Sequence, residues 1–286
     1  MIKEILQFLI YSIIIVLISK YLLVKILRKI GKLLNLKAKT IGNISGIATS
    51  IPELLTVSFS ALTGLIGAST YNIISSNVIN LVQYAVSIIL NKNQKVLRNK
   101  AIQVDLWLVL FTIFIPIFML VFNIENKITI LPLLIILLLI FFRITNNAHK
   151  LYMKQEKEEK QEENKEREEA NSGITVENYT KKDVSAVVTQ AILLAGVGIL
   201  LYIIGNLLGD VLNSLCRNFN VPEFVLGILL GFITSIPELI TFIESHRQHE
   251  NGREGVIEAT GNLLTSNIMN LFIIQSIGII IYHIFS

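Results

Sequence analysis

The chain has little charge, a single cysteine and no nucleotide-binding motif. Of its 286 residues, 16% are charged and 52% are hydrophobic, and the mean hydropathy is +0.63. A soluble domain of this length would need more charge on its surface, so the composition excludes an ordinary water-soluble protein. Cys216 is the one cysteine, which excludes an intrachain disulfide. No G-x-x-x-x-G-K-[ST] sequence is present, so nothing predicts an ATP site.

The sequence contains long apolar runs. Ile5–Val24, Val104–Ile124 and Ile128–Phe142 are nearly free of charged residues, and a helix needs about 20 apolar residues to cross a bilayer. We therefore predict an all-α polytopic membrane protein. The eight expected transmembrane helices are 4–24, 41–67, 70–90, 103–123, 128–148, 183–208, 222–246 and 256–284.

The distribution of Lys and Arg predicts how these helices are oriented. If the N-terminus lies outside, only Lys3, Lys127 and Arg217 fall outside, and every basic cluster falls inside. Cytoplasmic loops carry an excess of Lys and Arg. We therefore expect an integral protein of the cell (plasma or inner) membrane with its N-terminus outside and the lipid bilayer around it. The basic clusters are then topology determinants, and no nucleic-acid partner is expected.

A strongly charged segment divides the chain into two membrane halves, 1–148 and 183–286. Residues 149–182 are rich in Glu and Lys. Opposite charges four residues apart, as at Glu156 and Lys160, indicate that part of the segment extends the fifth helix into water. Because the segment lacks the Asp-rich spacing of an EF-hand, we interpret it as a cytoplasmic linker and not as a calcium sensor.

The two halves contain the same motifs in the same order. Thr49–Leu54 and Thr234–Leu239 both read TSIPEL, and a G-x-x-x-G pair precedes each. NIISSNVINL from Asn72 matches NLLTSNIMNL from Asn262. Five helices separate the equivalent elements, so the second copy enters the membrane from the opposite side. Inverted repeats of this kind place a substrate site near the midplane. The two repeats span about 41–90 and 222–284.

Two acids lie deep in the expected helices. Glu53 and Glu238 hold equivalent places in the second and seventh helices. A carboxylate inside the membrane is costly, and it marks a functional site by default. The other acids of the membrane halves, which include Asp105 and Glu258, fall at or near expected helix ends, where we expect water to solvate them.

Polar residues share the helix face of each glutamate. Hydroxyl groups three and four residues before Glu53 and Glu238 lie on that face. Pro52 and Pro237 each remove a backbone hydrogen bond, which frees a carbonyl one turn earlier. The full stripes are Ser45, Thr49, Ser50, Thr56 and Ser60; Thr234, Ser235, Thr241 and Ser245; Asn72, Ser76 and Asn80; and Asn262, Ser266 and Asn270.

Some of these residues have a simpler structural interpretation. The G-x-x-x-G pairs are expected to be close-packing surfaces. Asn77 and Asn267 are either interhelical hydrogen-bonding residues or ligands, and His246 and His249 are expected in a solvated loop. Five hydroxyls are expected to bond only their own backbone: those of Ser45, Thr56, Ser60, Thr241 and Ser245.

The chemistry of the whole group indicates a hard cation. It combines two carboxylates with hydroxyl, amide and carbonyl oxygens, and it contains no His or Cys. Ca²⁺ takes about 6–8 oxygen ligands. Na⁺ accepts the same ligands, whereas zinc or copper would recruit nitrogen or sulfur. No cofactor is predicted beyond the bound ions.

The paired motifs resemble the α-repeats of the Ca²⁺/cation antiporter superfamily, most closely its Na⁺/Ca²⁺ exchanger branch. Repeats of that branch carry a G-T-S-[LI]-P-E core followed by G-N-x-x-G-S-N-x-x-[ND]. The resemblance implies that Glu53 and Glu238 are the central cation ligands, and that the first and sixth helices slide across the core. It also implies oxygen ligands from Thr49, Ser50, Thr234, Ser235, Ser76, Asn80, Ser266 and Asn270, with the carbonyls of Gly46 and Gly231 lining flanking Na⁺ positions.

The chain departs from the family pattern in several places. Ala48 and Ile233 replace the glycine before Thr-Ser, and Asn270 stands where relatives can carry Asp. The family layout is two sets of five helices, whereas only three helices of the second set are expected here. Three alternatives stay open: natural absence of the last two helices, their supply by a partner or a homo-oligomer, and a truncated sequence.

The sequence thus predicts a secondary antiporter that exchanges Ca²⁺ against Na⁺. A proton-coupled Ca²⁺ exchanger, in which Glu53 and Glu238 accept protons, remains an alternative. A passive cation channel is a further alternative, although inverted repeats around one site favour alternating access. An enzyme is not predicted, because the expected helices contain no Asp pair, Ser/His pair or zinc motif.

Overall fold

The described residues contain eight helical spans that are long and apolar enough to cross a membrane, which confirms the predicted fold class. The computed structural model of the protein describes residues 2–26, 29–30, 38–168, 184–248 and 252–285. No strand occurs within those ranges. Most of the spans begin and end within a few residues of the predicted positions.

The first half contains five spans. Its helices are α1 (Ile2–Ile18), continued by a π-helical turn η1 (Ser19–Val24); α3 (Ala38–Thr49) and α4 (Ile51–Leu62), which form one span; α5 (Ile66–Leu90); η2 (Gln94–Arg98) and α6 (Lys100–Val121); and η3 (Ile128–Ile130) and α7 (Leu131–Glu168). Because α7 continues through Glu168, the first part of the charged segment extends the fifth span, as predicted. The rest of that segment, 169–183, lies outside the described residues.

The second half contains three spans. Its helices are α8 (Val184–Phe219); α9 (Glu223–Thr234) and α10 (Ile236–Gln248), which form one span; and α11 (Gly252–Ile268), the π-helical turn η4 (Met269–Ile274) and α12 (Gln275–Phe285), which form the last.

The sixth span ends later than predicted. It covers Ile192–Phe219, whereas the sequence suggested an end at 208, before the charges of Asp210 and Arg217. The helix continues because its charged end has a partner. Arg217 Nη2 donates to the carbonyl oxygen of Thr63 at 3.0 Å, where a cation favourably meets the C-terminus of α4.

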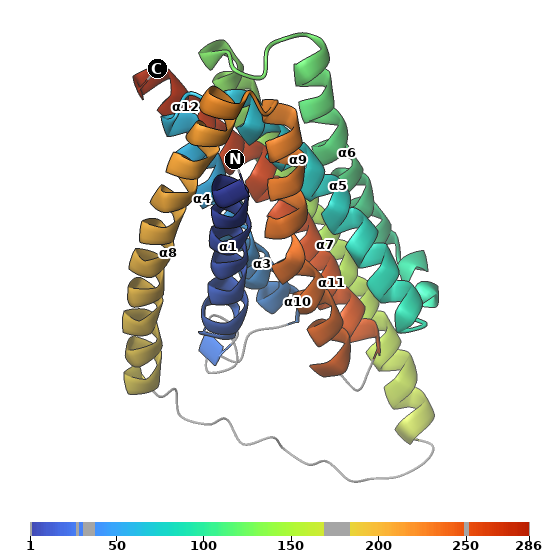
Figure 1. Ribbon diagram of the computed structural model, residues 1–286. Helices are drawn as coiled ribbons and strands as arrows, with labels where there is room; N and C mark the ends of the chain where they lie inside the picture. The colour runs from blue at the N-terminus through green and yellow to red at the C-terminus, as the bar shows by residue number, and fades with distance from the viewer. Residues whose placement is uncertain (1, 27–28, 31–37, 169–183, 249–251, 286) are drawn as a thin grey trace.

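Both chain termini lie at one end of the bundle (Figure 1). We call this the terminal end, and we call the opposite end, where α7 leaves the bundle and α8 enters it, the linker end. The described basic residues at the span ends follow the predicted division. Lys39, Lys92, Lys95, Arg98, Lys100, Arg247 and Arg253 lie at the linker end, and Lys3, Lys127 and Arg217 lie at the terminal end.

The two repeats interlock. Helix α3 of the first repeat packs along α11 of the second, and α9 of the second packs along α5 of the first. Glycines allow this close approach. A Cβ added at Gly46 would lie 2.6 Å from the carbonyl oxygen of Asn262, and one at Gly231 would lie 2.7 Å from that of Asn72. The G-x-x-x-G pairs are therefore packing surfaces, as predicted.

Helices α1 and α8 pack against each other on one side of the bundle, and α6 and α7 lie on the other (Figure 1). Two separate apolar clusters accompany this division. One joins α1 and α8 to α9 through residues such as Ile15, Leu208 and Leu230, and the other joins α6 and α7 to α11 and η4. The interlocked repeats lie between these two layers.

Candidate cation site

Two helix breaks position the site. Helix α3 ends at Thr49 and α4 begins at Ile51, while α9 ends at Thr234 and α10 begins at Ile236. A proline follows each break, and proline can neither donate a backbone hydrogen bond nor fit the interior of a straight helix. Each glutamate consequently sits in the first turn of the new helix, beside the break.

Glu53 and Glu238 are completely buried, and they are close enough to interact electrostatically. Each faces hydroxyls of the opposite repeat: Thr234 lies beside the Glu53 carboxylate, and Thr49 lies beside that of Glu238. None of the four carboxylate oxygens has a partner in hydrogen-bond geometry among the described residues. Two buried, unpaired carboxylates require a cation or a proton to offset their desolvation.

Threonine–asparagine bonds tie each helix break to the opposite repeat. The Thr49 hydroxyl donates to Asn262 Oδ1 at 3.3 Å, and the Thr234 hydroxyl donates to Asn72 Oδ1 at 3.5 Å. The two bonds are equivalents of one another in the inverted repeat. They orient the threonine side chains beside the glutamates.

The amide nitrogens of the same two asparagines also form equivalent bonds in the two repeats. Asn72 Nδ2 donates to the Thr56 hydroxyl at 2.6 Å, and Asn262 Nδ2 donates to the Thr241 hydroxyl. Thr56 and Thr241 in turn bond the backbone carbonyls of Glu53 and Glu238 at 3.1 and 2.8 Å. Both threonines bond their own backbone, but each also accepts a hydrogen bond from an asparagine, so the expectation that they bond only the backbone is wrong.

Four buried asparagines form a second crossed pair. Asn80 Nδ2 donates to Asn267 Oδ1 at 3.2 Å, and Asn270 Nδ2 donates to Asn77 Oδ1 at 3.0 Å. The Oδ1 atoms of Asn80 and Asn270 have no partner among the described residues. Asn77 and Asn267 thus form hydrogen bonds between helices, as one of the two interpretations given above expects. Their bonds leave the oxygens of Asn80 and Asn270 available to a ligand.

The serines of the site bond carbonyls or remain unpaired. Ser50 Oγ donates to the Gly46 carbonyl at 2.9 Å, and Ser76 Oγ lies 3.4 Å from the Gly231 carbonyl. Ser266 Oγ donates to the Leu263 carbonyl at 3.2 Å. Ser235 Oγ is buried with no partner among the described residues. The Gly46 and Gly231 carbonyls thus face site hydroxyls.

None of the five hydroxyls expected to bond only their own backbone does so. Three bond it but have a side-chain partner as well, and the other two do not bond it. Ser45 Oγ and Ser60 Oγ are buried and have no hydrogen-bond partner in the described part of the chain. The helix face predicted from spacing is correct, but spacing does not reveal whether a neighbouring carbonyl is within reach. Ser245 does bond the Thr241 carbonyl, at 2.7 Å, and it bonds Glu258 as well.

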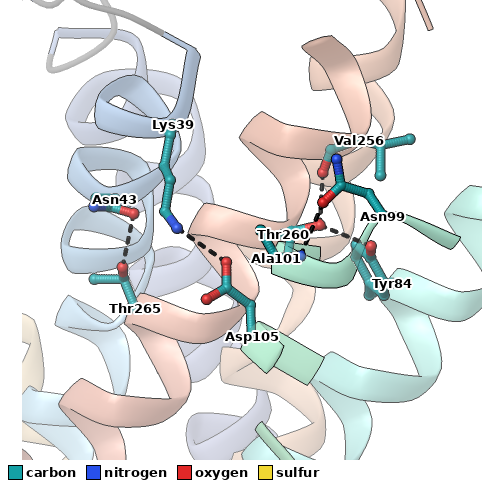
Figure 2. A network of polar contacts seen from close by, with 9 residues as sticks. All are labelled: Lys39, Asn43, Tyr84, Asn99, Ala101, Asp105, Val256, Thr260 and Thr265. Atoms are coloured by element: carbon teal, nitrogen blue, oxygen red, sulfur yellow. Dashed lines mark hydrogen bonds and ion pairs between the residues drawn. The ribbon is translucent and has the colours of Figure 1, made fainter. Parts of the chain in front are cut away.

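Three further expectations are wrong. Asp105 and Glu258 are buried rather than solvated at helix ends. Asp105 pairs with Lys39 at 3.0 Å across α6 and α3 (Figure 2). His246 lies within α10, largely buried, and contacts Asn93 at 3.1 Å instead of lying in a solvated loop. His249 lies outside the described residues. Helices α10 and α11 extend further than hydropathy predicts, because polar residues near their ends form hydrogen bonds with neighbouring segments.

The unpaired oxygens define the chemistry available at the site. They belong to Glu53, Glu238, Asn80, Asn270 and Ser235. No group of three His, Cys, Asp or Glu residues suited to a metal occurs in the described ranges, so a nitrogen- or sulfur-rich transition-metal centre has no support there. Oxygen ligands with two negative charges fit a hard cation such as Ca²⁺ or Na⁺.

Comparisons with known proteins show a family match and a similar fold. The family described as sodium/calcium exchanger protein matches residues 4–145 and 189–285. The fold is similar to the sodium-calcium exchanger NCX_Mj soaked with 10 mM Na⁺ and zero Ca²⁺, at 21% identity and a TM-score of 0.53, over 98% of this chain and 84% of that one. NCX_Mj soaked with 2.5 mM Na⁺ and 1 mM Sr²⁺ gives 23% identity and a TM-score of 0.51, over 96% and 81% of the two chains. No curated protein matches the chain.

Proposed function

The chain belongs to the sodium/calcium exchanger family, and we propose that it is a secondary antiporter that exchanges Ca²⁺ against Na⁺ through the site around Glu53 and Glu238. As a member of this family it is a membrane transporter and not an enzyme. NCX_Mj, whose fold this chain shares, is a sodium-calcium exchanger, which supports this ion pair. The same proposal places the protein in the cell membrane with the terminal end outside and the linker end in the cytoplasm.

One observation carries the proposal: two completely buried carboxylates, one from each repeat, lie close enough to interact electrostatically and have no hydrogen-bond partner among the described residues. Their joint charge matches one Ca²⁺ or about two Na⁺ without residual charge. Competition for one pair of carboxylates makes binding of the two ions mutually exclusive. Exclusive binding at a site that opens alternately to each face is sufficient for exchange.

The proposed ligands combine groups from both repeats. Glu53 and Glu238 supply charge, and the amide oxygens of Asn80 and Asn270 supply neutral ligands. The remaining proposed ligands are the hydroxyl or backbone oxygens of Thr49, Ser50, Thr234, Ser235, Ser76 and Ser266 and the carbonyls of Gly46 and Gly231.

Transport by the purified protein in liposomes tests the proposal. Ca²⁺ uptake is measured with an outward Na⁺ gradient, with a pH gradient at equal Na⁺, and with neither gradient. We expect uptake only with the Na⁺ gradient. Uptake driven by the pH gradient would identify proton-coupled exchange instead. Uptake down the Ca²⁺ gradient alone would identify a channel.

A further inference from the structure

We propose a second cation-binding station, formed by Glu258, Ser245 and Ser45 in the linker-end half of the bundle, which receives Ca²⁺ before it reaches Glu53 and Glu238. The inference rests on the function proposed above and adds an ion position to that transport path. Its elements are a buried carboxylate on α11, a hydroxyl on α10 and a hydroxyl on α3.

Glu258 lies on the same face of α11 as the proposed ligands. Glu258, Asn262, Ser266 and Asn270 recur every four residues, and residues at that spacing lie above one another on a helix. Glu258 is only 1% exposed and is one turn from Asn262, on the linker-end side. A carboxylate at this depth is a functional candidate by default.

Polar residues on α3 and α4 face this side of α11 and extend as far toward the linker end as Glu258 does. Ser45, Thr49 and Glu53 also recur every four residues. The hydrogen bond from Thr49 to Asn262 shows that the two stripes face each other at that turn. One turn further toward the linker end, a Cβ on Gly42 would contact the Glu258 backbone, so the helices stay in contact at this level. Ser45 Oγ, fully buried and unpaired among the described residues, is the hydroxyl of that turn.

Hydrogen bonds join the station to the central site. Ser245 Oγ donates to Glu258 Oε1 at 2.9 Å and lies 2.7 Å from the Thr241 carbonyl oxygen. Thr241 contacts Asn262 and the Glu238 backbone. Polar groups thus continue without interruption from Glu238 to Glu258. Transport through several adjacent weak sites lets an ion enter and leave without becoming trapped.

The equivalent level of the other repeat lacks a fully buried acid. In the terminal-end half, Leu230 stands for Ser45, Ser60 for Ser245, and Ala68 for Glu258. Glu223 reaches that level, but it is only partly buried, and its Oε2 already accepts a hydrogen bond from the Ala68 backbone nitrogen at 3.0 Å. The two halves of the path therefore differ at this level, where among the described residues only the linker-end half carries a fully buried acid. Because a carboxylate in a poorly hydrated place attracts a divalent cation strongly, the station should raise Ca²⁺ affinity on one face of the membrane only.

The nearest lysine on α3 is paired with a different acid. Lys39 lies one turn before Gly42 on α3, and its ammonium group already pairs with Asp105 at 3.0 Å (Figure 2). The carbonyl of Lys39 faces Gly261 on the side of α11 that packs against α3.

The test compares Glu258→Gln with the parent in oriented proteoliposomes. The half-saturating Ca²⁺ concentration is measured separately at each membrane face, and Glu254→Gln serves as the matched control because Glu254 is an exposed acid one turn earlier on α11. Glutamine keeps the size and the acceptor oxygen for Ser245 and removes only the charge. We expect a rise of about tenfold at the linker-end face, little change at the other face, and no effect of Glu254→Gln.

Equal changes at both faces, or no change at either, would overturn the station while leaving exchange itself intact. Absence of Na⁺-driven Ca²⁺ transport in the parent would instead overturn the proposed function. If Glu258→Gln fails to fold, Glu258→Asp and Ser45→Ala provide the second measurement. Glu258→Asp should keep the one-sided affinity, and Ser45→Ala should weaken it at the linker-end face only; the reverse pattern contradicts the inference.

Discussion

Asn270 donates its side-chain amide to Asn77 Oδ1, 3.0 Å away across the boundary between the two repeats. Asn77 in turn donates its own amide to the Thr112 carbonyl of α6 at 3.1 Å. Asn77 therefore cannot turn its amide around without losing that bond. Its oxygen holds the nitrogen of Asn270, and this directs the Asn270 oxygen away from Asn77.

We predict that Asn77→Ala weakens Ca²⁺ binding without unfolding the protein. The variant frees the Asn270 side chain to rotate, and loss of one buried hydrogen bond costs about 1–1.5 kcal/mol, or roughly tenfold in affinity. Isothermal titration with Ca²⁺ measures the change. Asn267→Ala should act equally through Asn80, and Asn91→Ala, at an exposed position, should not. Unchanged Ca²⁺ affinity in both buried variants would show that these asparagines do not position ligands.

A second prediction concerns the two central acids. Glu53→Gln or Glu238→Gln alone should abolish Na⁺/Ca²⁺ exchange, because each removes half of the charge that balances Ca²⁺ where charge interactions are strong. Removing a buried charge that lacks a hydrogen-bond partner should leave the unfolding temperature equal or higher. Calcium flux in liposomes and thermal unfolding in detergent measure the two effects. Near-normal flux in either variant would contradict the two-carboxylate site.

The orientation of the chain is tested by cysteine labelling in a Cys216→Ser background. Lys127 and Lys95 are both exposed, and they lie at the terminal end and the linker end respectively. We expect an impermeant thiol reagent to label Lys127→Cys from outside in intact cells and Lys95→Cys only after the membrane is opened. Labelling of both from outside would contradict the eight-span arrangement. Labelling in the reverse order would invert the proposed orientation.

Much of this arrangement follows from sequence patterns. Runs of apolar residues predict the eight spans. The doubled TSIPEL motif predicts a lost backbone hydrogen bond before each glutamate and the equivalence of Glu53 and Glu238, although not that each span divides into two helices. Period and repetition are properties of the chain itself. Both can therefore be recognised from the sequence before any contact between helices is known.

Contacts between helices cannot be predicted from sequence patterns in this way. Ser45 and Thr56 look alike in sequence, yet Thr56 bonds the Glu53 carbonyl, and Ser45 has no partner in the described residues. Glu258 seemed to belong to a solvated helix end, because hydropathy falls toward the start of α11. The helix is buried there because α3 packs along it and Ser245 donates a hydrogen bond to the Glu258 carboxylate. Which polar residue is buried depends on its partner from the other repeat.

Close packing of the repeats supplies the last prediction. A Cβ at Gly231 would clash with Ser75 Oγ and would lie 2.7 Å from the Asn72 carbonyl oxygen. The second contact is with backbone, which cannot move aside alone. Gly231→Ala should therefore push α9 from α5, at a cost of about 1–3 kcal/mol. The shift should also lengthen the bond from Thr234 to Asn72, three residues further along α9, and so reduce Ca²⁺ affinity as well as stability.

Gly198→Ala is the matched control, because no atom lies within 4 Å of a Cβ added at that position on α8. Alanine favours helix by up to about 1 kcal/mol over glycine, so this variant should be equally or more stable. Thermal unfolding in detergent and Ca²⁺ titration compare the two variants. Gly46→Ala should resemble Gly231→Ala, since its Cβ would meet the Asn262 carbonyl at 2.6 Å. If Gly231→Ala and Gly198→Ala unfold at the same temperature, close approach of α9 to α5 does not limit stability, and the interlocked packing does not position the site.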